Sequence, residues 1–237
     1  MDETNKTVRA VTTEYIPMMA LRGITVFPNM NIHFDVGREM SIRALDAAMS
    51  SGQPIFLVSQ RELAEEKPGL DGLYSVGTIS TVRQILRLQG DSVRVMVAGQ
   101  GRGRLKSLVQ TDPYYIAEVE ALPEGKSAHH SARAEAQIRS VYETFELYCQ
   151  LSPKMSPEAY IAILASDDPG YIADYIAQSI PMRNEDKQTI LAEVRPLRRL
   201  EKMYRLLQRE AEILSIEDDI QNKVRERVNG NQRDYYL

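Results

Sequence analysis

A change in residue pattern near position 123 constrains the fold of this 237-residue chain more than any other feature. Ten of the 13 glycines lie upstream, from Gly23 to Gly103, where short apolar runs alternate with turn residues. Downstream, apolar residues recur every three or four positions. The first pattern is typical of β-strands and the second of amphipathic helices. The sequence therefore predicts an α+β fold, with a β-rich domain at residues 1–122 and helices after a linker at residues 123–127.

The β-rich half is predicted to form a compact, barrel-like domain of strands with one helix. Residues 77–98 are expected to form a hairpin whose turn lies at 89–91. Side chains alternate along a strand, so Val93, Val95 and Val97 should share one face. The glycine-rich run 99–103 is predicted to be a β-bulge or a turn. The remaining strands are expected at 16–21, 31–36, 54–59, 104–110 and 114–122, and the helix at 39–49.

The second half is predicted to be all-α, with a bundle of short helices at residues 128–195. Ser156 and Asp168 each precede a proline, a pairing that is typical of a helix start, and another short helix is expected at 185–194. Such helices bury their apolar faces only by packing together. From Pro196, apolar residues continue at spacings of three and four, so residues 196–237 should form a long helix that projects as a coiled coil or strut.

Composition and charge exclude several classes of protein. The single cysteine, Cys149, excludes an intrachain disulfide and a multi-cysteine zinc site, and it lies on an apolar helical stripe as a core thiol would. The net charge of −4 gives no support to a dedicated nucleic-acid binder. No segment approaches the roughly 18 consecutive apolar residues of a membrane span, and residues 1–15 contain no secretory signal. These features favour a cytosolic protein that does not enter a membrane.

No catalytic, metal or cofactor site is predicted. Residues 125–127 resemble the end of a phosphate-binding loop, but Glu120 occupies the position where that loop needs its first glycine. His33, His129 and His130 lack the spacing of metal ligands. We therefore expect this chain to be a binding or structural protein.

Several separated motifs resemble the N-terminal region of Lon proteases, in the order in which that family has them. In Lon proteases, this region precedes an ATPase module, which uses ATP and Mg, and a Ser-Lys protease module. Neither module is recognisable here, so we expect a non-catalytic fragment without a cofactor; the alternative is a naturally short relative. The resemblance extends from Tyr15 to Leu237 and rests on the runs PMMALRGITVFPNM (17–30), VGREMSIRAL (36–45), VGTI (76–79), VRVMVAGQGR (93–102), RLEK (199–202) and NQRDYYL (231–237).

The resemblance implies that the parent is a cytosolic, homohexameric, ATP-dependent serine protease that degrades damaged and regulatory proteins. This region would capture unfolded substrates through exposed apolar side chains and help to assemble the hexamer. Pro28 ends ladder pairing, so its neighbours should lie at a sheet margin. The candidate contacts come from this proline-broken segment and from the hairpin tip: Met18, Phe27, Pro28, Met30, Leu86 and Leu88.

Two other functions stay open on the sequence alone. One is nucleic-acid binding, because some Lon proteins bind DNA and compact barrels often bind RNA. The other is scaffolding by the long helix, without substrate contact. The salt dependence of binding distinguishes nucleic-acid binding from apolar capture of substrates, because binding to phosphates weakens steeply as the salt concentration rises. The nucleic-acid surface would be an arginine stripe on the β-rich half: Arg83, Arg87, Arg94, Arg102 and Arg104.

Overall fold

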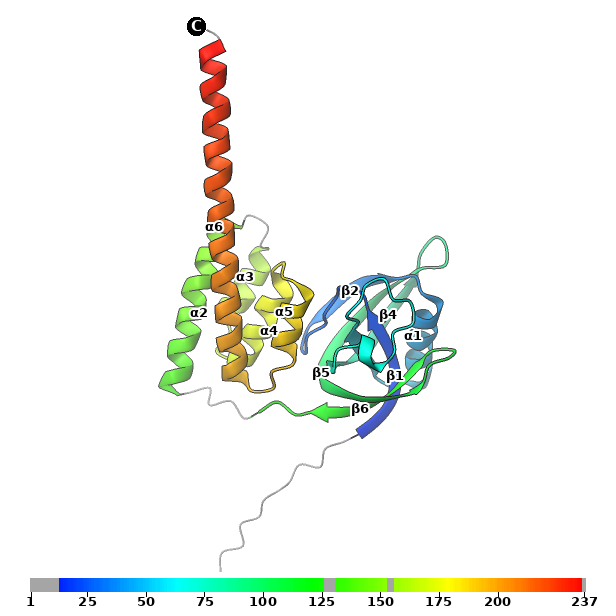
Figure 1. The fold of residues 1–237 in the computed structure, drawn as a ribbon. Coiled ribbons are helices and arrows are strands. Elements are labelled where there is room, and N and C mark those ends of the chain that lie inside the picture. Colours follow the sequence, from blue (N-terminus) through cyan, green and yellow to red (C-terminus); the bar gives the residue numbers. More distant parts are fainter. Residues whose placement is uncertain (1–12, 126–130, 153–155, 236–237) are drawn as a thin grey trace, which may run out of the picture. The chain divides into compact units, whose positions relative to one another are not determined.

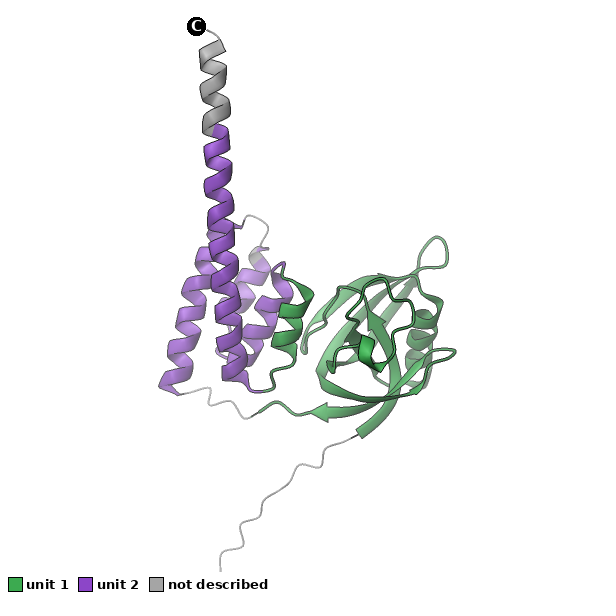
Figure 2. Ribbon diagram, in the orientation of Figure 1, with its two compact units in different colours: residues 1–125, 182–194 green, residues 126–181, 195–237 purple. Residues whose placement is uncertain are grey.

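A computed structural model of the chain describes residues 13–125, 131–152 and 156–235 (Figure 1). The chain divides into two compact units (Figure 2). Unit 1 comprises residues 1–125 and 182–194, and unit 2 comprises residues 126–181 and 195–237. The predicted linker residues 126–127 lie outside the described residues.

Unit 1 contains a six-stranded sheet that closes on itself, which confirms the predicted barrel-like domain. The strand order is β2-β5-β4-β3-β1-β6, and a further pairing of β5 with β6 closes the five strands from β5 to β6 into a ring, to which β2 is added on β5. Closure depends on the 18-residue strand β5, which pairs with β2 and β4 along its first part and with β6 along its second. The strands are β1 (Thr13–Leu21), β2 (Asn31–Val36), β3 (Ile55–Ser59), β4 (Val76–Arg87), β5 (Val93–Gln110) and β6 (Tyr115–Leu122).

The glycine-rich run 99–103 is a bulge within β5, one of the two predicted alternatives. Ser80 of β4 faces Gly99, and the preceding Ile79 faces Gly101. The residue between these glycines therefore has no partner on β4, which is the definition of a bulge. The strand predicted separately at 104–110 is the continuation of the hairpin arm.

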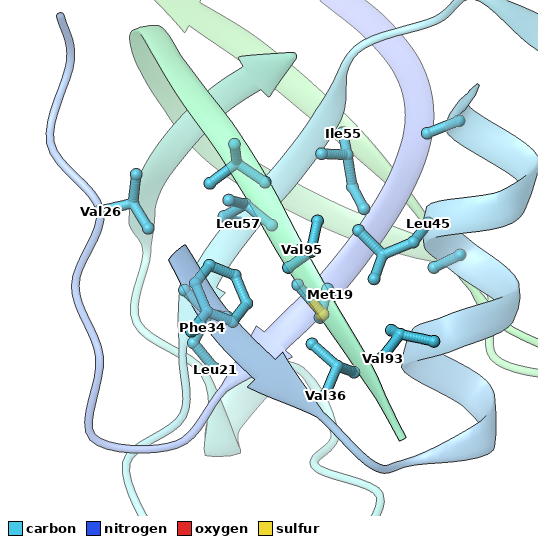
Figure 3. Packing of buried hydrophobic residues seen from close by; sticks show 13 residues of the cluster. Met19, Leu21, Val26, Phe34, Val36, Leu45, Ile55, Leu57, Val93 and Val95 are labelled. Carbon is cyan, nitrogen blue, oxygen red and sulfur yellow. The ribbon is translucent and has the colours of Figure 1, made fainter. Parts of the chain in front are cut away.

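Two apolar clusters fill unit 1. The first lies between the sheet and helix α1 (Glu39–Ser51) (Figure 3). Val93, Val95 and Val97 all belong to it and are buried, which confirms their predicted common face. The second cluster contains the residues of β1 that alternate with those of the first. Because β1 faces apolar side chains on both sides, its sequence is a continuous apolar run without polar alternation.

Helix α5 (Asn184–Leu191) groups with unit 1, so the prediction that residues 185–194 belong to the helical bundle is wrong. A buried polar network explains this. The side-chain amide of Gln188 donates hydrogen bonds to the hydroxyl of Ser59 at 2.8 Å and to that of Thr25 at 3.2 Å. Buried polar groups are stable only when they are paired, so α5 is held to the strands by polar contacts that apolar periodicity does not reveal.

Unit 2 is a helical bundle whose predicted helix starts are confirmed. The Ser156 hydroxyl accepts a hydrogen bond from the backbone N–H of Ala159. The Asp168 carboxylate accepts from the backbone N–H groups of Gly170 and Tyr171. These side chains satisfy amide groups that have no partner within their helices. The helices are α2 (Ala132–Leu151), α3 (Pro157–Leu164), α4 (Pro169–Ser179) and α6 (Pro196–Tyr235).

Helix α6 is packed along its first part and extends beyond the other helices of unit 2 (Figure 1). Leu200, Met203 and Leu207 are fully buried, and α6 contacts α2 and α4. Farther along, the apolar stripe is 42–56% exposed. The predicted projecting helix is therefore present, and its exposed stripe consists of Ile213, Ile216, Ile220 and Val224.

The exposed stripe of α6 is expected to gain protection only by pairing with a second copy of the chain. Amide hydrogen exchange over residues 213–224 should be slow at high protein concentration and faster on dilution. Ile220→Asp should accelerate it at every concentration, whereas Gln221→Asp, an exposed neighbour with the same charge change, should have little effect. Slow exchange that is independent of concentration would contradict this expectation.

Candidate functional site

Four of the six candidate contact residues are buried, so the prediction that they lie at the surface is wrong. Met18 and Phe27 are fully buried, and Pro28 and Met30 are also buried. Met18 belongs to the second apolar cluster of unit 1. These four side chains therefore stabilise the fold and do not present a surface to a partner.

The segment that contains Phe27 is buried because β5 holds its backbone closely. The N–H of Gly99 donates to the carbonyl of Met30, and the carbonyl of Gly99 accepts from the N–H of Asn29, both at 2.9 Å. A Cβ atom at position 99 would lie 2.2 Å from the carbonyl oxygen of Phe27. Glycine permits this approach because it has no side chain. The segment is not a strand, but it covers the barrel and buries its side chains.

The other two candidates, Leu86 and Leu88, remain at the surface, at the end of β4 and in the turn that leads to β5. Leu86 is 48% exposed, and Leu88 is partly buried. Because the two leucines are two positions apart along an extended segment, their side chains should point to the same side of the hairpin. The turn is fixed by a hydrogen bond from the N–H of Leu88 to the carbonyl of Ser92 at 3.0 Å and by Gly90 at a φ of 87°.

Helix α1 packs against the other face of this hairpin. The guanidinium of Arg87 lies 3.9 Å from the carboxylate of Asp46 on α1. Arg87 pairs with the buried Val93, so α1 packs on the face of β4 that Arg87 presents. Leu86 pairs with the exposed Arg94 and therefore points to the opposite face. We refer to Leu86 and Leu88 together as the hairpin surface.

The predicted arginine stripe is not a continuous basic surface. Arg102 is only 4% exposed, and its Nε donates to a main-chain carbonyl of α5 at 2.8 Å. Arg94 is paired with Asp35 at 2.7 Å, and Arg104 lies 3.8 Å from Glu120. One arginine of the proposed stripe is thus buried, and others have carboxylate partners that reduce the positive potential available to phosphates.

A pocket between the end of β1 and β2 was not anticipated from the sequence. Its volume is about 300 Å³. Met19, Leu21, Phe34 and other apolar residues line it, and Arg22 and Arg38 also contribute to its wall. We refer to it as the β1–β2 pocket. Residues 36–38, Val-Gly-Arg, precede α1 in the sequence, but nothing in their pattern shows that the Arg38 side chain borders an apolar cavity.

The described residues contain no group of three or more His, Cys, Asp or Glu side chains placed to hold a metal ion. His129 and His130 lie outside the described residues. Burial raises the pKa of the Cys149 thiol to about 11, and the nearby Glu146 carboxylate adds to the rise. This thiol is therefore a poor nucleophile at neutral pH. Within the described ranges, no helix is both long and apolar enough to span a membrane.

Residues 15–209 match the family described as the ATP-dependent protease La (LON) substrate-binding domain. The Lon protease of Desulforamulus reducens is 39% identical over 222 residues, which cover 94% of this chain and 27% of that protein. The Lon protease of Clostridioides difficile is 39% identical over 225 residues, which cover 94% of this chain and 29% of that protein. This chain therefore spans less than a third of the length of these relatives.

The fold also resembles solved structures. The N-terminal domain of Mycobacterium avium complex Lon protease aligns with a TM-score of 0.66 at 19% identity, covering 84% of this chain and 98% of that one. The Lon N-terminal domain protein from Xanthomonas campestris aligns with a TM-score of 0.55 at 15% identity, covering 81% of this chain and 97% of that one. At these identities, the likeness concerns the fold alone.

Proposed function

Because this chain belongs to the family of Lon substrate-binding domains, we propose that it binds unfolded segments of protein substrates through the hairpin surface. The observation that carries the proposal is the position of Leu86, which is 48% exposed, and of the partly buried Leu88 beside a fixed turn. Exposed apolar side chains that lie together favour binding to other apolar groups. An unfolded chain presents such groups without a fixed geometry, so a shallow surface suits it better than an enclosed polar pocket.

The proposal extends to a longer parent protein with the ATPase and protease modules of the relatives. The parent would act in the cytoplasm as a homohexamer that degrades misfolded and regulatory proteins. Six hairpin surfaces would then act together, and their combined affinity would exceed that of one. The exposed stripe of α6 supports a role in assembly, because apolar stripes of this spacing pair between helices.

The hairpin surface is tested by capture of a reduced, unfolded client protein. Leu86→Asp and Leu88→Asp should each weaken binding by about tenfold, because burying a carboxylate against apolar groups is unfavourable. Val109→Asp is the matched control, since Val109 is a 57% exposed apolar residue elsewhere in β5. The measurement is the dissociation constant at low and at high salt, after circular dichroism has shown that each variant is folded.

Apolar capture predicts that binding to the wild-type chain persists at high salt. Unchanged binding in both leucine variants, together with loss at high salt, would contradict the proposal and favour electrostatic binding by the arginines. An equal loss of affinity in Val109→Asp would show that the added charge weakens binding wherever it is placed on the surface.

The isolated chain is expected to hydrolyse neither ATP nor casein. It lacks a G-x-x-x-x-G-K-[ST] phosphate-binding loop, and its match is to a substrate-binding domain. The measurement is release of phosphate and of casein peptides by the purified chain, compared with a mock preparation. Activity above the mock would contradict the expectation, provided that it stays with the chain through a second purification step.

A further inference from the structure

The β1–β2 pocket combines an apolar wall with two neighbouring cations. Met19, Leu21, Phe34 and Val36 line it and also belong to the first core cluster, so their positions are fixed by packing. Figure 3 shows Leu21 and Phe34 close together at the edge of this cluster. An apolar side chain that entered the pocket would therefore meet a preformed apolar surface.

Arg22 and Arg38 both line this pocket. Their guanidinium groups donate hydrogen bonds to consecutive main-chain carbonyls, of Glu65 at 3.2 Å and of Glu66 at 3.1 Å. Arg38 also donates to the side-chain oxygen of Gln60 at 2.7 Å. Burial lowers the pKa of Arg38, and the positive charge of Arg22 lowers it further. Two like charges at one pocket repel each other, so an anion bound at both would be stabilised.

The neighbouring carboxylates leave this positive charge largely uncompensated. Asp35 also lines the pocket, but Arg94 donates two hydrogen bonds to it, at 2.7 and 2.9 Å, which lower its pKa. The exposed Glu66 side chain acts on Arg38 only at longer range. In the part of the chain that the structure describes, no carboxylate is within the 4.0 Å of an ion pair with Arg22 or Arg38.

We propose that the β1–β2 pocket binds the C-terminal residue of a substrate polypeptide, with its apolar side chain against the pocket wall and its terminal carboxylate at Arg22 and Arg38. This proposal rests on the proposed function in that it takes a polypeptide as the ligand. A C-terminal residue carries both groups on one Cα atom, which matches a pocket whose apolar and cationic parts adjoin. Arginine suits the role because its planar guanidinium binds carboxylates in a bidentate manner.

The size of the pocket favours a chain end over a threaded segment. A volume of about 300 Å³ lies at the lower end of the range for ligand pockets. Such a space accommodates one or two residues. Capture of a C-terminal carboxylate by converging donors is also an established way in which proteins recognise peptides.

The test uses three fluorescein-labelled peptides and measures binding by fluorescence anisotropy. The first is Gly-Ser-Gly-Ser-Leu with a free C-terminus, and the second is the same peptide with a C-terminal amide. The third, Gly-Ser-Leu-Asp-Gly amide, carries its carboxylate on an internal side chain. We expect the free acid to bind about tenfold more tightly than either amide, the size of effect that a charge-assisted hydrogen bond produces.

Variants then locate the binding. Arg22→Gln and Arg38→Gln should each reduce affinity for the free acid several-fold, and Arg104→Gln should not, although it removes the same charge from unit 1. Arg22→Gln should disturb the fold less than Arg38→Gln, because Arg22 is exposed and makes a single hydrogen bond to the main chain. Thermal unfolding of each variant shows whether the fold is retained.

Each result decides for or against the pocket. Equal binding of the free acid and its amide would overturn the proposal, and so would wild-type affinity in both arginine variants. Binding of the internal-aspartate peptide as tightly as the free acid would overturn the assignment to a chain end. Leu86→Asp separates this proposal from the hairpin surface: it should leave the free acid bound normally, and failure of the hairpin surface to bind unfolded clients would not change this titration.

Discussion

Replacing Phe27 with alanine is expected to lower the free energy of unfolding by about 3–5 kcal/mol, as is typical when a buried aromatic ring is deleted. Phe27 is fully buried, and its backbone is held against β5 through Gly99. The loss combines the transfer free energy of the ring with the cavity that it leaves. Urea unfolding followed by circular dichroism measures this change, as a lower midpoint with a similar slope.

Leu63→Ala is the matched control, because Leu63 is an apolar residue that lies largely exposed in a loop of unit 1. Its effect should stay within about 0.5 kcal/mol. At a temperature where Phe27→Ala is still folded, its affinity for an unfolded client should equal that of the wild-type chain. A stable Phe27→Ala variant that no longer binds the client would instead make Phe27 a contact residue and would contradict its assignment to the core.

Replacing Asp174 with alanine should destabilise unit 2 by about 3–5 kcal/mol, because it removes one member of a buried ion pair. Asp174 on α4 lies 3.2 Å from Nε of Arg199 on α6, and both side chains are almost completely buried. The pair joins two helices of the bundle across the packed part of α6. Loss of α-helical signal during urea unfolding measures the change in stability.

The exposed Asp218 on the projecting part of α6 provides a control for the removal of a carboxylate, and Asp218→Ala should change stability by less than about 0.5 kcal/mol. The double variant Asp174→Leu with Arg199→Met should recover much of the loss, since apolar pairs often replace buried ion pairs without penalty. Equal stabilities of Asp174→Ala and the wild-type chain would show that the buried pair contributes nothing.

Local signals predicted most of the secondary structure correctly. The alternation of Val93, Val95 and Val97 identified a buried face, because side-chain direction in a strand depends only on position. The helix starts at Ser156 and Asp168 were predictable because a capping side chain and a proline act within one turn. The long helix from Pro196 followed from apolar spacing alone. These features require no knowledge of distant parts of the chain.

The errors concern contacts between residues that are distant in sequence. Pro28 suggested a sheet margin, but Gly99, more than 70 positions away, holds that segment over the barrel. Gln188 looked like one polar residue of a bundle helix, but it is buried against Ser59 and Thr25. The candidate binding residues show the same dependence on distant contacts. Leu86 was predictable because it belongs to a local hairpin. The position of Arg38 at a pocket was not, because residues of β1 and β2 together line that pocket.

The most direct test of the central claim is photo-crosslinking of a bound client from defined positions. A photoreactive apolar analogue is placed at position 86 of the hairpin surface or at position 109, where the native side chains are similarly exposed. With a reduced, unfolded client at high salt, crosslinks should form mainly from position 86. Equal crosslinking from both positions, or crosslinking only from position 109, would contradict substrate binding by the hairpin surface.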